Sequence, residues 1–292
     1  MSIRETETET EAPAAPLRRT APSPGRARWV RRLRGDRAPL SWEWRTLVLF
    51  ALLALWQLAS ATDILRSEVL AAPSDVAARF VALVLSGDLQ NALLTSLSRA
   101  ALGFLLGTAI AVAAAVLVAL TRVGDAVIDP PLQILRTLPL LGLVPLFIIW
   151  FGVGEWPKIL LVALGVSIPL YVNLVLGIRS IDPDLYELAD ALDFSARARF
   201  AHIIIPGAAP GALVGLRQAL GFSWLALIVA EQIAADAGLG FLINNARDFL
   251  QTDTIIVGLL TYAMLGLVTD GIVRLVEQRT TRWRGTREVT HG

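Results

Sequence analysis

The distribution of charge constrains this 292-residue chain more than any other feature, because long uncharged stretches alternate with short charged segments. Four stretches of 17 to 22 residues carry no Asp, Glu, Lys or Arg, and two further apolar stretches carry one charged residue each. An α-helix needs about 20 mostly apolar residues to cross the roughly 30 Å hydrocarbon core of a bilayer. The sequence therefore predicts six membrane spans, over residues 46–62, 100–121, 137–154, 159–178, 210–230 and 254–273.

The composition agrees with a membrane protein. The chain is 55% hydrophobic and 17% charged, whereas soluble globular chains are about 45–50% apolar and about 25% charged. We expect an all-α polytopic membrane protein with an N-terminal tail over residues 1–44, a transmembrane domain over residues 45–276 and a C-terminal tail over residues 277–292. The Arg/Pro-rich N-terminal tail has too few large apolar side chains to offset the entropy lost on ordering, which predicts disorder.

The basic residues indicate how the spans are oriented. With the N-terminus in the cytoplasm, 20 Lys and Arg residues fall in cytoplasmic segments and five in outer segments. Cytoplasmic loops carry an excess of Lys and Arg, so both termini are expected in the cytoplasm. The first stretch ends in Ala59-Ser60-Ala61, a pattern typical of signal-peptide cleavage sites. Because a long segment precedes it and five spans follow, we prefer an uncleaved first span.

Three absences exclude whole classes of chemistry. The chain has no cysteine, which excludes disulfides, iron–sulfur clusters, thiolate zinc sites and cysteine nucleophiles. His202 and His291 are its only histidines, too few for a histidine-rich metal site. Lys158 is its only lysine and lacks the Gly-Lys-Ser/Thr context of a phosphate-binding P-loop. We therefore expect no cofactor on this chain, and if ATP drives it, another chain hydrolyses the nucleotide.

Few ionisable groups lie inside the expected spans. An ion-driven carrier keeps such groups near mid-membrane, where they bind the coupling ion. Asp270 lies near the inner end of the last span, where Arg274 at i+4 can pair with it. Glu231 ends the fifth span and can brace the loop that leads to Gly238. These residues are structural or gating charges. An ion-coupled secondary transporter and a membrane-embedded enzyme are the alternatives, and the second lacks a paired histidine or carboxylate constellation.

Prolines, small residues and polar residues predict how the spans pack. Pro139, Pro145 and Pro169 are expected to kink or unwind the third and fourth spans. Gly103 and Gly107, four residues apart, allow another helix to approach the second span closely. Four polar residues are candidates for lining a translocation pathway, and each alone has an interhelical hydrogen bond as the competing interpretation. They are Ser167, Asn173, Gln218 and Ser223.

The cytoplasmic segment over residues 179–209 is much longer than the other inside connections. Its sequence predicts two short helices that meet at a corner. Asp182 is a good N-cap with Pro183 at the first helical position. Ser195 can cap the second helix, and Pro206 is expected to end that helix before the fifth span begins.

This segment resembles the cytoplasmic signature of bacterial binding-protein-dependent ABC importer permeases. The signature reads Glu-Ala-Ala, three residues, Gly, nine residues, Ile-x-Leu-Pro. Here Glu187-Leu188-Ala189 occupies the first block, Asp193 the glycine position and Ile203-Ile204-Ile205-Pro206 the last, with matching spacing. Further stretches are similar to the nitrate/sulfonate/taurine branch of that family: Leu135–Pro139, Leu146–Gly152, Ala230–Gln232, Gly238–Ile243 and Leu250–Asp253.

The resemblance implies a type I ABC importer permease, a non-enzymatic subunit of the bacterial plasma (inner) membrane. The loop would be a coupling helix that docks on a separate ATPase, which holds the ATP and Mg. The implied assembly is a homodimer of this chain in the lipid bilayer, with two ATPase subunits and an extracytoplasmic solute-binding protein, and with no nucleic acid. The implied solute is nitrate, a sulfonate, taurine or a similar small compound. The implied coupling residues are Glu187, Leu188, Ala189, Asp193, Arg197, Ile203 and Pro206.

Two residues of the loop depart from the signature. Leu188 replaces an alanine, which changes only packing bulk. Asp193 replaces the glycine, and a glycine there would serve a left-handed corner, which Asp tolerates at a cost of roughly 1 kcal/mol. The sequence leaves two conformations open, the left-handed corner and a regular turn.

Overall fold

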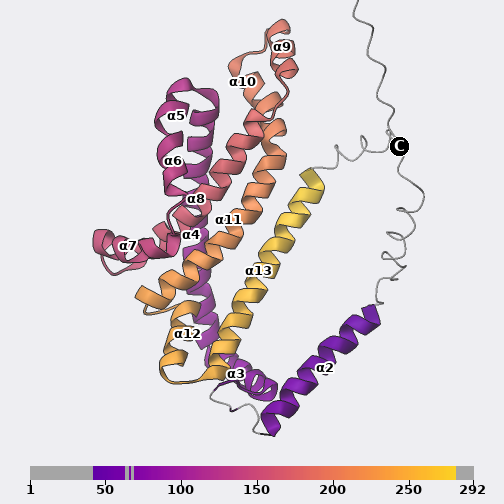
Figure 1. Cartoon of the computed structure of the whole chain (residues 1–292), viewed down its shortest axis with the longest axis vertical. Helices are drawn as coiled ribbons and strands as arrows, with labels where there is room; N and C mark the ends of the chain where they lie inside the picture. Colours follow the sequence, from indigo (N-terminus) through magenta and orange to yellow (C-terminus); the bar gives the residue numbers. More distant parts are fainter. Residues whose placement is uncertain (1–41, 63–65, 67–68, 281–292) are drawn as a thin grey trace, which may run out of the picture. The chain divides into compact units, whose positions relative to one another are not determined.

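The computed structural model describes residues 42–62, 66 and 69–280 of the chain. Every regular element in these residues is a helix, as the sequence predicts (Figure 1). The expected tails over residues 1–44 and 277–292 lie mostly outside the described residues. Helix α2 (Trp42–Ala61) is described by itself, because the chain before residue 55 forms a unit separate from residues 55–292. Its apolar part, Thr46–Ala61, coincides with the first expected span.

Four long apolar helices form the body of the larger unit: α4 (Asp88–Leu120), α8 (Glu155–Arg179), α11 (Ile205–Ala234) and α13 (Thr252–Thr280). Each is long and apolar enough to cross a membrane. Helix α8 packs against both α4 and α11, and the main core cluster draws residues from all three. These helices correspond to the second, fourth, fifth and sixth expected spans.

The glycine pair on α4 permits the closest helix contact in this core. A Cβ built on Gly103 would lie 2.6 Å from Cβ of Val162, and one built on Gly107 would lie 2.8 Å from Cβ of Val166. Real side chains do not approach this closely, so only glycine fits at either position. The small-residue spacing predicted from the sequence therefore marks the α4–α8 contact.

The third expected span, residues 137–154, contains only the 3₁₀ turn η1 (Leu140–Leu143) and α7 (Val144–Phe151) as helical elements. Two short helices, α5 (Arg122–Val127) and α6 (Asp129–Leu135), precede it. The segments Arg122–Leu135 and Leu140–Phe151 meet at 93°. A single span over residues 137–154 was therefore the wrong prediction. Pro139 lies in the break because it lacks a backbone N–H and disfavours helix in the residue before it. Arg136, expected in a cytoplasmic loop, lies at this break.

Short helices lie at both ends of the bundle (Figure 1). One end holds α3 (Pro73–Ser86), which joins α4 through the left-handed Gly87, and α12 (Leu239–Asp248). The other end holds α9 (Pro183–Ala191) and α10 (Ala196–Arg199), which form the loop between the fourth and fifth spans. A π-helical turn, η2 (Phe200–Ile204), connects α10 to α11.

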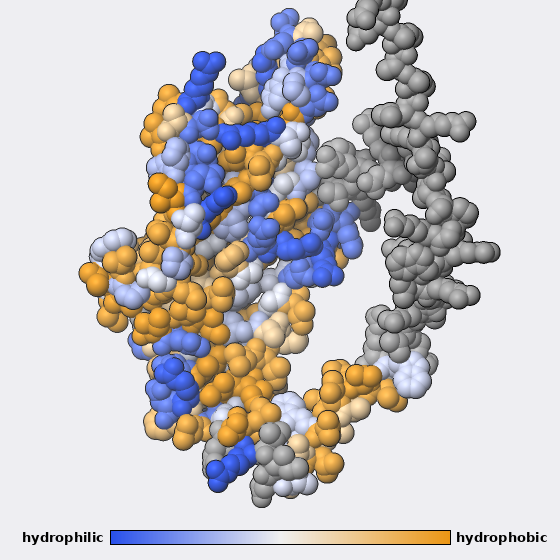
Figure 2. Space-filling view, viewed as in Figure 1, coloured by the Kyte–Doolittle hydropathy of each residue, from blue (hydrophilic) through white to orange (hydrophobic). Residues whose placement is uncertain are grey.

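The long helices carry large apolar side chains on their outside. Leu105 of α4, Ile149 of α7 and Leu267 of α13 are each at least 66% exposed. Figure 2 shows hydrophobic residues over much of α7 and the lower half of the bundle, and hydrophilic residues gathering over α9, α10 and part of α13. Such an extensive apolar surface suits a hydrocarbon environment and a partner subunit, because soluble monomers rarely expose contiguous apolar patches of this kind.

Candidate functional site

The loop between the fourth and fifth spans begins with a capped helix. Asp182 Oδ1 accepts a hydrogen bond from the backbone N–H of Asp184 at 3.1 Å, and Pro183 occupies the first turn of α9. Ala189 is buried, and half-buried Tyr186 packs against the cluster of Ile178, Ile204 and Ala208. Burial raises the pKa of the Tyr186 phenol above its ordinary value. One side of α9 is therefore fixed onto the ends of α8 and α11.

The corner after α9 is left-handed. Asp193 has φ +50°, in the region that Asp and Asn tolerate better than most residues. The backbone N–H of Phe194 donates to the carbonyl of Ala189 at 2.9 Å. Arg199 ties the corner together, since it pairs with Asp190 at 2.6 Å and donates to the carbonyl of Phe194 at 3.0 Å. Of the two conformations that the sequence left open, the structure has the left-handed corner.

The second helix of the loop continues into the fifth span. Ser195 Oγ caps α10 by accepting from the N–H of Ala198 at 3.3 Å. The N–H of Ile205 then donates to the carbonyl of Phe200, five residues back, and the helix Ala196–Ile233 runs for 38 residues. The prediction that Pro206 ends this helix was wrong. Pro206 falls in the first turn of α11, immediately after the π-helical turn, where its missing N–H is tolerated.

The predicted coupling residues divide into an exposed and a packed group. Glu187, Leu188, Asp193 and Arg197 are exposed, whereas Ala189 is buried and Ile203 and Pro206 are half-buried. Within the described residues, Glu187 and Arg197 take part in no ion pair. Leu185 and Leu188 of α9, and Leu192 at its C-cap, are each at least 44% exposed. The loop thus presents apolar side chains and a carboxylate to its surroundings from a braced backbone.

The structure brings two of the four pathway candidates together. Asn173 Nδ2 donates to Gln218 Oε1 at 3.0 Å, which links α8 to α11, and also donates to the carbonyl of Pro169 at 2.8 Å. Both side chains line a cavity of about 380 Å³. Ser167 and Ser223 are not among its lining residues, and each hydroxyl donates to a carbonyl of its own helix.

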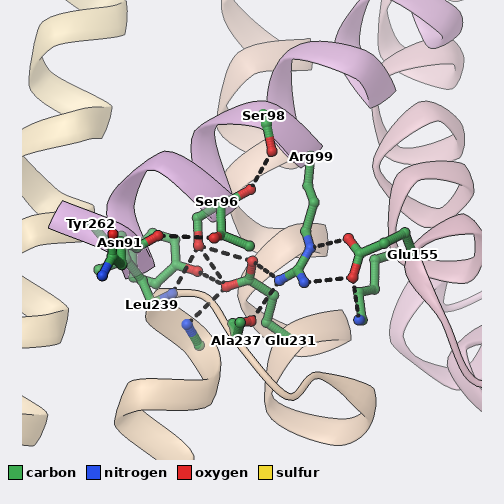
Figure 3. Close-up of polar contacts among 12 residues, drawn as sticks. Asn91, Ser96, Ser98, Arg99, Glu155, Glu231, Ala237, Leu239 and Tyr262 are labelled. Carbon is green, nitrogen blue, oxygen red and sulfur yellow. Dashed lines mark hydrogen bonds and ion pairs between the residues drawn. The ribbon is translucent and has the colours of Figure 1, made fainter. Parts of the chain in front are cut away.

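A buried charge network lies where α4, α8 and α11 meet (Figure 3). The Arg99 side chain, 2% exposed, donates from Nε and Nη2 to Glu155 at 2.5 and 2.7 Å. Its Nη1 donates to Glu231 at 2.8 Å and to the carbonyl of Ala237 at 2.6 Å. Lys158 Nζ, equally buried, is 3.0 Å from Glu155. Arg99 and Lys158 lie just outside the spans expected from the sequence, and only the i,i+3 spacing of Glu155 and Lys158 signals part of the network.

Glu231 is the best-satisfied acceptor of this network. Its side chain is 0% exposed and accepts from Ser96 Oγ at 2.8 Å, Tyr262 Oη at 3.0 Å and the N–H of Gly240 at 2.8 Å, in addition to Arg99. Gly238 has φ +109°, and a Cβ there would lie 2.6 Å from Cδ of Glu231. The carboxylate thus fixes the turn between α11 and α12 against α4.

The other two predicted charges lie in a separate, more exposed group. Asp270 Oδ2 accepts from Nε of Arg274 at 2.8 Å, the i,i+4 pair anticipated from the sequence. Asp270 Oδ1 also lies 3.3 Å from Arg217, which pairs with Glu277 at 2.8 Å. These contacts connect α11 to α13.

Comparison with known proteins places this geometry in a family. The profile of the family described as "Binding-protein-dependent transport system inner membrane component" matches residues 103–282. The chain is 44% identical to the putative aliphatic sulfonates transport permease protein SsuC of Escherichia coli, over 80% of this chain and 88% of that protein. It is 38% identical to the protein of the same description from Bacillus subtilis, over 88% and 93%.

Two further similarities extend the comparison. The taurine transport system permease protein TauC of Escherichia coli is 30% identical, over 84% of this chain and 94% of that protein. A crystal structure described as an amino acid ABC transporter with histidines matches with a TM-score of 0.57 and 18% identity. It covers 68% of this chain and 98% of that one. This last likeness concerns the fold alone.

Proposed function

The chain belongs to the family of binding-protein-dependent transport system inner membrane components, and from this premise we propose that it is the translocating subunit of an importer driven by a separate ATPase. It is a multi-pass inner membrane permease of the ABC transporter class, with the described helices forming its spans. In the proposed assembly, two copies of the chain combine with two ATPase subunits, which bind ATP and Mg, and with an extracytoplasmic solute-binding protein.

The braced loop of α9, α10 and η2 is the observation that carries this proposal. A permease that is driven by a separate ATPase subunit needs a surface on which that subunit can dock and a rigid connection from this surface to the spans. The exposed side chains of α9 supply the surface, and the unbroken helix from Ala196 to Ile233 supplies the connection. Movement of the docked loop would then tilt the fifth span as a body. In this proposal the loop and both termini lie in the cytoplasm, which the excess of Lys and Arg in those segments supports.

The proposed solute is a small sulfonate such as an alkanesulfonate or taurine. The support is the similarity to permeases that are described as transporting aliphatic sulfonates and taurine. Nitrate, which the sequence resemblance also implied, has no relative of that description among these. An ion-coupled carrier is less favoured, since the two carboxylates that contact Arg99, those of Glu155 and Glu231, are both held in ion pairs in the described structure.

Reconstitution tests the proposal directly. The full chain is co-expressed with a candidate ATPase of the ABC class, purified and placed in liposomes. ATP hydrolysis is measured with and without a solute-binding protein loaded with labelled butanesulfonate. We expect the two chains to co-purify, hydrolysis to rise on addition of the loaded binding protein, and label to accumulate only with ATP. Failure to co-purify would contradict the coupling proposal, and coupling without uptake of any sulfonate would contradict the substrate.

A further inference from the structure

We propose that the cavity between the broken third span and the middles of α8 and α11 is a binding site for the anionic group of the transported solute, with Arg136 as its cationic ligand. The cavity has a volume of about 380 Å³, within the range of about 300–1,000 Å³ typical of small-molecule sites. The choice of solute in this inference rests on the proposed function. The existence of the site does not.

The position of the cavity suits a site on a transport route. It is lined by Pro169 and Asn173 of α8, and by Gln218 and Phe222 of α11, residues near the middle of both spans. Arg136 reaches the cavity from the break between α6 and η1. An arginine inside a membrane-spanning region normally faces a polar or water-filled interior, because exposure to lipid is costly.

Arg136 has no carboxylate partner among the described residues, unlike several other basic residues of the spans. Arg99 and Lys158 share Glu155, Arg179 pairs with Asp125, and Arg217 and Arg274 share Asp270. Within residues 42–62, 66 and 69–280, no ion pair and no side-chain hydrogen bond involves Arg136. The cavity therefore contains one positive charge that the described residues do not neutralise, as a site for a monovalent anion requires.

The neighbouring side chains complete a site for an organic oxyanion. A guanidinium binds planar or tetrahedral oxyanions through two parallel N–H donors. Both amide hydrogens of Asn173 are already used, in hydrogen bonds to Pro169 and Gln218. Gln218 accepts through its Oε1, and its amide nitrogen has no protein acceptor among the described residues. That N–H₂ group is therefore available to a second oxygen of the ligand. The remaining walls are apolar and suit a short alkyl chain: Leu138, Leu140, Val172 and Phe222.

Direct binding to the purified full-length chain in lipid nanodiscs tests the site without any ATPase. Equilibrium dialysis measures the affinity for labelled butanesulfonate and for its neutral isostere butanesulfonamide. The test variant is Arg136→Gln, which breaks no ion pair and so leaves packing unchanged. The matched control is Arg122→Gln, which removes another unpaired, exposed arginine from the same segment but outside the cavity.

We expect the wild-type chain and Arg122→Gln to bind butanesulfonate equally, and Arg136→Gln to bind it at least about tenfold more weakly, as loss of a charged hydrogen-bond partner predicts. We also expect butanesulfonamide to bind weakly to all three. Equal butanesulfonate affinity in the wild type and Arg136→Gln would overturn the site, as would an absence of binding to the wild type or an equal loss for both compounds.

Uptake by the reconstituted transporter separates this inference from the proposed function. If butanesulfonate binding depends on Arg136 but the complete transporter moves no sulfonate, the site stands and the proposed substrate fails. If uptake of butanesulfonate is normal in Arg136→Gln, the proposed function stands and the site is wrong.

Discussion

Arg99 illustrates what a buried charged side chain requires inside an apolar bundle. Its guanidinium is 2% exposed, which would be very unfavourable for an isolated charge. Glu155 and Glu231 neutralise it, and the carbonyl of Ala237 takes a further hydrogen bond. Counting charges along the sequence cannot detect this arrangement, because the partners lie on two other helices. The count therefore started the second span after Arg99, although α4 begins at Asp88.

We predict that Arg99→Met destabilises the chain strongly. Removing one partner of a buried pair leaves uncompensated charge on Glu231, at a cost of about 3–5 kcal/mol. Thermal unfolding of the purified protein in detergent measures the loss. The control is Arg247→Met, which removes an exposed pair with Asp248 worth at most about 1 kcal/mol. Similar melting temperatures for the two variants would show that the network contributes little.

A second prediction concerns Gly238. Alanine there would have to adopt φ +109° and would clash with the Glu231 carboxylate, so Gly238→Ala should cost at least about 1–3 kcal/mol from backbone strain alone. Gly266→Ala in α13, where a Cβ meets nothing within 4 Å, should be neutral or stabilise by up to about 1 kcal/mol. Melting temperatures that move in the same direction would contradict the proposed difference.

At the scale of elements, local signals were the most predictable. The caps of α9 and α10 follow from Asp182-Pro183 and Ser195, because capping depends on residues that are neighbours in sequence. The effect of proline was predicted correctly at Pro139 and wrongly at Pro206. The π-helical turn precedes Pro206 and ends at Ile204, which packs against Ile178 and Ala208, and no local sequence pattern reveals that contact.

We predict that Glu187→Lys uncouples transport while leaving the chain folded in the membrane. Glu187 is exposed and unpaired in the described structure, so its charge can be reversed without breaking an internal contact. ATP-driven sulfonate uptake should fall by an order of magnitude or more. A reversed charge at residue 187 would no longer be complementary to the surface of the ATPase that docks there. Uptake and the amount of protein in membranes are measured together. Asp248→Lys on exposed α12 at the opposite end should transport normally, and wild-type uptake by Glu187→Lys would argue against docking at α9.

At the scale of the whole molecule, hydropathy predicted an all-helical membrane protein and the number of apolar segments. It did not predict that the third segment bends by 93°. It also did not predict which polar residues meet: Asn173 and Gln218 face one cavity with Arg136, whereas Ser167 and Ser223 bond within their own helices. These side-chain contacts depend on the rotation of each helix about its own axis relative to its neighbours. In apolar helices, only small residues such as Gly103 and Gly107 indicate that rotation.

A prediction for the whole molecule concerns its energy source: we expect that an ion gradient alone does not drive transport by this chain. Liposomes that contain only this chain should accumulate no butanesulfonate when a proton or sodium gradient is imposed, since Glu231, the buried carboxylate of the described residues, is already paired with Arg99. Addition of the ATPase, the binding protein and ATP should start accumulation. The measurement is trapped label against time under each condition. Accumulation under the gradient alone would instead favour an ion-coupled carrier.

The unbroken helix from Ala196 to Ile233 has a mechanical consequence. Its 38 residues correspond to a rod of roughly 57 Å at about 1.5 Å per residue. A pivot of only about 5° around its midpoint displaces each tip by roughly 2–3 Å, given that length. Glu231 sits close to the far tip and holds the turn that carries Gly238 and Gly240. A displacement of the loop of α9 and α10 would therefore move the turn that carries Gly238 and Gly240, at the other end of the helix, by a similar distance.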